Sequence, residues 1–311
     1  MTLLRGQILT TGPLALIAIC YAIAGPASVT TQSVESPLPA TGRVSNSAGK
    51  AFDCKKTADD LAQKLPADWT VLISDPFVLA GDCHQDQLAK YFRDTISPTA
   101  QALSVQYFDT HPAWPITIIL CSSDESYREC HHSLNERDRS EYAGIYSRGE
   151  HRLIVNIATG EGTLAHELTH ALAHADFPDL PEWLDEGLAS LYEECEFTSD
   201  GTRLIGAENW RGAALHGLMQ RGELRSIVDL ATEQFAAENA AVDYAQARYF
   251  CLYLQQRNLL EPFYRKCRSQ SKADRTGLQA LAECFNRNDF RSIDVQFQSW
   301  LRTSTPSRPS L

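Results

Sequence analysis

The pattern of apolar and polar positions divides the chain into a strand-rich first half and a helical second half. Short blocks rich in β-branched or aromatic residues predict strands. They lie at residues 69–73, 77–80, 115–121, 143–147 and 152–156. The last two flank a turn at residues 148–150 and therefore predict a hairpin.

Apolar residues at helical spacing predict helices between and after these strands. The expected early helices cover residues 53–65, 85–108 and 124–134, and Pro98 kinks or divides the second of them. From Trp210 onward the spacing predicts helices only, at residues 210–221, 227–230, 240–256, 260–269, 276–285 and 293–301. The predicted fold class is therefore α+β, with a mixed sheet followed by a helical C-terminal subdomain.

Composition supplies the expected boundaries. Residues 1–24 carry Arg5, an apolar run and Ala22-Ile23-Ala24 before Gly25, which is typical of a cleaved export signal. An uncleaved membrane anchor is the alternative. The Ser/Thr/Pro/Gly-rich segment 25–50 predicts a flexible linker. We then expect an α+β core over 51–207, a helical subdomain over 208–302 and a tail over 303–311.

Charge and cysteine content agree with an exported protein. The formal net charge of −11 disfavours nucleic acid or an anionic membrane surface as a partner. Signal cleavage would leave eight cysteines, an even number that suggests disulfides in a bacterial periplasm, cell envelope or secreted setting. The shortest loops predict Cys54–Cys83, Cys121–Cys130 and Cys267–Cys284, which leaves Cys195–Cys251. Buried free thiols are the alternative.

The segment that carries the clearest chemistry begins at His166-Glu167-Leu168-Thr169-His170. Residues four apart lie on one face of a helix, so His166 and His170 can bind one ion. Glu186 follows in a second predicted helix, after a turn with two prolines, and completes the His2Glu ligand set of a catalytic zinc. Glu167 is then placed as general base for a zinc-bound water. One Zn²⁺ per chain is expected.

The same segment resembles the gluzincin metallopeptidases. Residues 183–189 (Trp-Leu-Asp-Glu-Gly-Leu-Ala) match the W-L-x-E-G-[FL]-A block that carries the third zinc ligand in that clan. The similarity is closest to the peptidase MA-like family of exported proteins, over residues 144–194 and again at 244–250. It implies a zincin-like core, with His166, His170 and Glu186 as ligands and Glu167 as base. The G-x-M-E-N segment of aminopeptidases is not found, so the resemblance favours an endopeptidase.

The resemblance also implies further roles. Gluzincins hold the oxyanion with a downstream Tyr or His, and Tyr244 is our candidate. Arg248 could instead hold a substrate carboxylate or carbonyl. Thermolysin-type members have an Asp four residues after the third ligand, which orients a zinc-bound histidine, and Ser190 stands there. Its hydroxyl is a weaker substitute, and Asp185 and Asp176 are others.

Other histidines and other functions remain open at this point. His174 is an alternative third ligand. Residues 130–132 (Cys-His-His) near Cys121 could make a second metal site, but a disulfide beside two surface imidazoles is favoured in an exported protein. The predicted function is an exported zinc metallopeptidase that acts on peptide or protein substrates. A zinc amidase for cell-wall peptides, a deformylase-like enzyme with Cys130 as ligand, and an inactive zinc-containing binding or scaffold protein are the alternatives.

Overall fold

The computed structural model describes residues 53–137, 139, 141–236 and 239–304. The predicted export signal, the linker and residues 305–311 of the tail lie outside the described residues. The described chain is α+β, as the sequence predicts, with one mixed sheet and a large helical portion. Among the described residues, no helix has the length and apolar character that crossing a membrane requires.

All five predicted strands form, and they make one sheet in the order β1-β2-β3-β5-β4. The strands are β1 (Thr70–Ser74), β2 (Phe77–Gly81), β3 (Ile116–Cys121), β4 (Gly144–Ser147) and β5 (Arg152–Asn156). β2, β3 and β5 run parallel, whereas β1 and β4 are antiparallel to their neighbours. The predicted hairpin is thus β4–β5, and β4 forms an end of the sheet.

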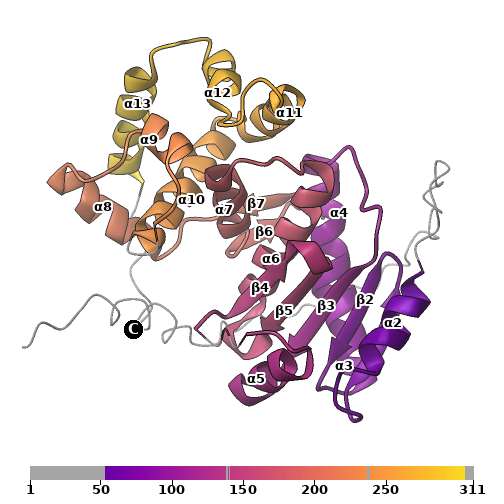
Figure 1. The fold of residues 1–311 in the computed structure, drawn as a ribbon. Coiled ribbons are helices and arrows are strands. Elements are labelled where there is room, and N and C mark those ends of the chain that lie inside the picture. Colours follow the sequence, from indigo (N-terminus) through magenta and orange to yellow (C-terminus); the bar gives the residue numbers. More distant parts are fainter. Residues whose placement is uncertain (1–52, 138, 140, 237–238, 305–311) are drawn as a thin grey trace, which may run out of the picture.

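Helices cover both faces of the sheet because alternate side chains of its central strands point to opposite sides. On one face, Val78, Ile119 and Ile154 pack under α2 (Cys54–Ala62) and α5 (Asp124–Ser133). The neighbouring residues on the same strands face the other way, toward α4 (Ser97–Gln106) and α6 (Glu161–Asp176). The result is a helix–sheet–helix sandwich (Figure 1).

The predicted helix over residues 85–108 is interrupted just before its proline. It consists of α3 (Gln85–Tyr91), a π-helical turn η1 (Phe92–Ile96) and α4. Pro98 has no N–H for the carbonyl four residues earlier, and its ring crowds that carbonyl. The wider turn relieves the conflict, because the Ser97 N–H reaches back five residues to the Phe92 carbonyl.

Two helices position the motif residues. α6 starts after Gly160, whose φ of 114° turns the chain into the helix, and it ends at Asp176 before Pro178. α7 (Glu182–Leu191) follows at once, with Pro181 as its extended N-cap residue. The two prolines therefore separate the helices as predicted, and α7 lies beside α6.

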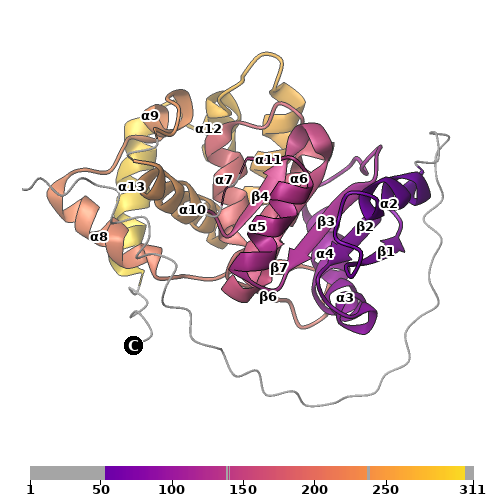
Figure 2. The same cartoon turned by 60° about the horizontal axis from the view of Figure 1, so that its bottom comes forward.

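The second half of the chain contains the six predicted helices, with ends shifted by a few residues. They are α8 (Arg211–Arg221), α9 (Ile227–Thr232), α10 (Ala240–Gln256), α11 (Leu260–Gln270), α12 (Leu278–Phe285) and α13 (Phe290–Thr303). They gather on the α7 side of the sheet (Figures 1 and 2). α10 packs closely on α7, and one cluster of buried side chains continues from the sheet into these helices.

This close approach depends on Gly187. A Cβ atom at that position would lie 2.8 Å from both the Ala247 carbonyl oxygen and the Cys251 sulfur of α10. Glycine is therefore required there by space alone. Because Glu186 directly precedes Gly187, this contact also fixes the position of Glu186 relative to the C-terminal helices.

A hairpin of β6 (Cys195–Phe197) and β7 (Leu204–Gly206) is present that the sequence analysis did not predict. Each strand has three residues, which is too short for a period-two pattern to stand out. The hairpin is held from outside by side-chain amides: Gln106 bonds both backbone groups of Leu204, and Gln255 bonds both of Gly206. Those partners lie far away in the sequence.

All eight described cysteines are free thiols, so the structure contains none of the four predicted disulfides. Cys54 lies against Asp75, with 3.6 Å between its sulfur and the Asp75 Oδ1. Cys195 donates to the Tyr192 carbonyl at 3.3 Å. Cys121 and Cys130 do come together in one buried cluster, where the neighbouring Cys130 thiol and burial raise the pKa of Cys121. Oxidation of that pair in an exported protein stays a prediction.

Candidate metal centre

The two motif histidines converge on one point. Helical spacing places His166 and His170 one turn apart on the face of α6 that looks toward α7. Their Nε2 atoms are 3.0 Å apart, and the rings meet edge to face. His170 is 7% exposed and His166 is half-buried, so the pair lies between the two helices rather than on the open surface.

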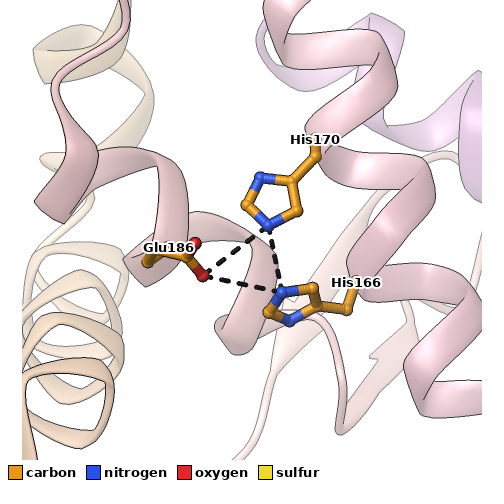
Figure 3. A group of neighbouring side chains, drawn as sticks. All are labelled: His166, His170 and Glu186. Atoms are coloured by element: carbon orange, nitrogen blue, oxygen red, sulfur yellow. Dashed lines mark hydrogen bonds and ion pairs between the residues drawn. The ribbon is translucent and has the colours of Figure 1, made fainter. Parts of the chain in front are cut away.

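Glu186 completes a triangle with these atoms. It lies on the first turns of α7, and its Oε2 is 3.6 Å from the Nε2 of each histidine (Figure 3). The three side chains form a group whose ligand atoms could hold one metal ion. The structure therefore brings together all three ligands that the sequence predicts.

A carboxylate lies behind each histidine. The Nδ1 of His170 is 2.6 Å from Asp185 Oδ1, and the Nδ1 of His166 is 3.0 Å from Glu193 Oε1. The hydrogen bond to Asp185 holds the Nδ1 proton of His170, and the charge of Glu193 favours the same tautomer for His166. Nε2 is then the atom with a free lone pair in each ring. Both lone pairs then point into the triangle with Glu186.

This arrangement fits a small cation. Two atoms bound to one tetrahedral ion at about 2.0–2.1 Å lie about 3.3 Å apart, close to the 3.0 and 3.6 Å separations found here. Two imidazole lone pairs and a carboxylate oxygen that face one another repel unless a proton or a cation lies between them. The geometry and the donor set of His166, His170 and Glu186 therefore match a metal site.

Shifts in acidity show the same excess of negative charge. Burial disfavours charged imidazoles, yet Asp185 and Glu186 outweigh it and hold the pKa of His170 well above its ordinary range. Glu193 likewise raises the pKa of His166 against burial. In spite of burial, contacts with His166 and Arg211 lower the pKa of Glu193 to about 2. A bound divalent ion would supply the positive charge that compensates the carboxylates of Asp185, Glu186 and Glu193.

Each of the two carboxylates is held in turn by a more distant group. Asp185 Oδ2 contacts the Nε2 of His174 at 2.7 Å. Glu193 forms a two-pronged ion pair with Arg211, whose guanidinium carbon lies 4.4 Å from the Trp210 ring centroid. Neither carboxylate can therefore rotate freely away from its histidine.

His174, Asp185 and His170 form a second group with metal-binding atom types. In this group His170 contributes Nδ1, the nitrogen opposite the one that faces His166 and Glu186. Each of the two Asp185 oxygens contacts one of these histidines at hydrogen-bond distance, so shared protons account for this group without an ion. We therefore interpret His174 as a support for Asp185 and not as a ligand.

Glu167 lies beside the triangle and is itself buried, with 7% exposure. Burial raises the pKa of its carboxyl group, and the nearby histidines oppose that rise. Gly144 at the start of β4 faces it directly: a Cβ there would come within 3.1 Å of Glu167 Oε1 and 2.7 Å of a Thr163 methyl carbon. The end strand of the sheet thus passes directly over the predicted base.

Tyr244 lies on α10, the helix that packs against α7. It is half-buried, one turn before Ala247, which is the residue that meets Gly187. Its ring packs edge to face on Phe235, with centroids 5.6 Å apart. Its role toward an oxyanion stays a prediction.

The structure contradicts the roles predicted for Arg248 and for the Ser190 hydroxyl. Arg248 is fully buried and donates from Nε to the Ser190 carbonyl at 2.9 Å and from Nη2 to the Ala207 carbonyl at 2.6 Å. It therefore ties the end of α7 to the segment after β7 and cannot hold a substrate. Ser190 takes part in this contact through its main chain, and the carboxylates of Asp185 and Glu193 are the groups that orient the histidines.

Asp176 is also structural. Its carboxylate accepts the backbone N–H groups of Asp109 and Thr110 at 2.9 and 2.8 Å and pairs with Arg268 and Tyr264. It therefore fastens the C-terminal end of α6 to the loop after α4 and to α11. This is an anchor for the helix that carries the motif, not a contact to a ligand.

Cys130 and its neighbours lie elsewhere. Cys130 is buried on α5 against Cys121, and the metal-binding group contains Glu186 instead. His131 is 1% exposed, packs on Tyr127 and faces Glu136, so it is not the surface imidazole that the sequence analysis expects. The deformylase alternative, which needs Cys130 as ligand, has no support in this arrangement.

Sequence reasoning missed Glu193 and Arg211. Glu193 and Glu194 follow the C-terminal end of α7, where the helix dipole disfavours negative charge. An acidic pair at that place indicates a nearby cation or proton donor, and this signal could have pointed to His166 and Arg211. Gly162 is a second signal that the Glu193 segment lies close to α6. A Cβ at residue 162 would lie 2.4 Å from the Glu193 carbonyl oxygen.

No family model matches the chain, and no curated protein shows significant similarity to it. The functional inference therefore rests on the residues and geometry described above.

Proposed function

We propose that this chain is an exported zinc-dependent metallopeptidase of the gluzincin type, with a zincin-like core and endopeptidase activity. The observation that carries the proposal is the triangle of His166, His170 and Glu186 with Glu167 beside it. The N-terminal signal features support export. The sheet, the motif-bearing α6 and the following α7 support a zincin-like core, because they place three ligands from two helices at one point.

Zinc suits this donor set. Two neutral imidazoles and one carboxylate are the ligands of many catalytic zinc sites, which keep a fourth position for water. Bound zinc would polarise a carbonyl group and lower the pKa of its water to about 7. His166, His170 and Glu186 would hold it, and Asp185 and Glu193 would keep the two rings in the required tautomer.

Glu167 is the proposed general base. Its carboxylate would accept a proton from the attacking water and deliver it to the amine that leaves when the C–N bond breaks. Burial favours this role, since it brings the pKa of the carboxyl group closer to neutrality. Tyr244 is the proposed donor to the developing oxyanion.

The position of β4 supports a peptide substrate. As the last strand of the sheet, β4 presents main-chain groups on its outer edge, and Gly144 brings that edge next to Glu167. Extended peptides bind such edges by adding a strand. A peptide held there would have its backbone amide close to the base and to the ligand triangle.

Metal analysis of purified protein tests the ligand assignment. We expect one zinc per chain for the wild type and for Cys130→Ser, and a large loss of bound zinc for Glu186→Ala. Zinc content is measured after gel filtration against a weak chelator, and circular dichroism confirms that each variant is folded. Loss of zinc in Cys130→Ser with full retention in Glu186→Ala would contradict the proposal.

A further inference from the structure

The C-terminal helices border an open cavity of about 480 Å³ that includes none of the proposed metal ligands. It lies where α10 and α12 end and is bordered by α13. Its polar wall consists of the amides of Gln256, Asn258 and Gln296 and the guanidinium groups of Arg257 and Arg287. No carboxylate is among the described residues that line it.

Arg257 is an exposed residue whose guanidinium group lies against two aromatic rings. Its guanidinium carbon lies 5.3 Å from the ring centroid of Tyr253 and 5.8 Å from that of Phe285, and these two rings are nearly parallel. These cation–π contacts do not use the N–H groups of Arg257 as hydrogen-bond donors to an anion. None of the ion pairs between described residues involves Arg257.

Arg287 lies close to the same point. Its Nη1 donates to Ser292 Oγ at 2.8 Å, and it too has no ion-pair partner among the described residues. Burial raises the pKa of the Tyr253 hydroxyl, while the charges of both arginines lower it, so both lie near that oxygen. The Tyr253 hydroxyl is buried and has no hydrogen-bond partner in the described structure.

The positions of Arg257 and Arg287 at helix ends explain in part why two positive charges lie together here. Arg257 caps α10 and Arg287 follows the end of α12, where the helix dipole favours cations. That attraction lets the fold tolerate two neighbouring guanidinium groups. The attraction to the helix dipole does not use the paired N–H donors of the two guanidinium groups. These donors match the two oxygens of a carboxylate or phosphate.

We propose that this cavity binds a small organic anion through a carboxylate or phosphate group held by Arg257 and Arg287. The volume lies within the range of about 300–1,000 Å³ that is usual for small-molecule sites. Leu259, Cys284 and Phe285 supply an apolar wall for the carbon part of the ligand. Gln256 adds an amide N–H donor, because its oxygen is already bonded to Trp300.

Calorimetric titration of the full-length protein at constant ionic strength tests this site. Citrate probes the carboxylate source, inorganic phosphate probes the phosphate source, and sodium chloride is the blank. We expect saturable binding of at least one probe with one site per chain. Arg257→Gln and Arg287→Gln should each weaken it about tenfold or more, because each removes charged hydrogen bonds.

Matched variants keep the result interpretable. Arg291→Gln makes the same change on an exposed part of α13 outside the cavity and should bind as the wild type does. Arg257→Lys keeps the charge but removes the fork and should also weaken binding. If Arg257→Gln does not fold, Arg257→Lys and Arg287→Gln carry the test. Heats equal to the chloride blank, or equal affinity in the cavity variants, would overturn the site.

The proposal is independent of peptidase activity. Glu186→Ala, which is expected to lose the zinc, leaves the cavity unchanged and should bind the anion with wild-type affinity. Loss of anion binding in that variant would mean that the heat arises at the metal centre, and the cavity assignment would then be wrong.

Discussion

Glu167→Gln should abolish peptide hydrolysis while leaving one zinc bound per chain. Glutamine keeps the shape of the side chain and fills the space under Gly144, but it cannot accept a proton from water. A general base contributes about 10²- to 10⁴-fold to a rate, so kcat should fall by at least that range. Turnover and zinc content are to be measured on the same preparation.

Glu161→Gln provides the matched control. Glu161 lies on the first turn of α6, is exposed, and accepts a hydrogen bond from Thr95 at 2.7 Å. The same chemical change there should leave both zinc and turnover unaltered. Unchanged turnover in zinc-loaded Glu167→Gln would rule out Glu167 as the base.

Asp185→Asn and Glu193→Gln should each weaken zinc binding by about 10- to 100-fold, the usual effect of removing a carboxylate that holds a metal-bound histidine. Asp185 is 2.6 Å from His170 and Glu193 is 3.0 Å from His166. Both changes keep size and remove charge, so they reduce the basicity of the ligand without opening a cavity. Competition with a chromophoric chelator gives the affinity.

The Ser190→Ala variant tests whether residue 190 orients a zinc-bound histidine, as the resemblance to the gluzincins implies. The resemblance would place the orienting group at residue 190, whereas Arg248 binds the carbonyl of Ser190 and the carboxylates lie at residues 185 and 193. Zinc affinity should therefore be unchanged in Ser190→Ala, with thermal unfolding recorded to confirm folding. Weakening in Ser190→Ala but in neither carboxylate variant would show that the orienting residues are misassigned.

The ligand triangle could be predicted because it depends on local rules. Helical periodicity alone places His166 and His170 on one face, and the Pro178–Pro181 turn limits how far Glu186 can lie from them. The central strands were equally clear, since residues 115–121 form a continuous β-branched run. These features require no knowledge of distant contacts.

The support around the triangle could not be predicted in the same way. Arg211 reaches Glu193 from beyond the β6–β7 hairpin, and that hairpin is held by Gln106 and Gln255 from distant helices. The burial of Arg248 departs from expectation because an arginine is rarely buried, and nothing in its spacing shows that its partners are main-chain carbonyls. Such contacts follow from tertiary packing and not from sequence period.

The central claim is that this metal centre cleaves peptides. The most direct measurement is the digestion of a proteome-derived peptide library by zinc-loaded protein, by chelated protein and by the same protein after zinc is returned. We predict cleavage at internal peptide bonds that disappears on chelation and reappears with zinc, and that Glu167→Gln never shows. A folded wild-type chain with one zinc and no cleavage of any peptide would contradict the claim and favour a zinc-containing binding protein.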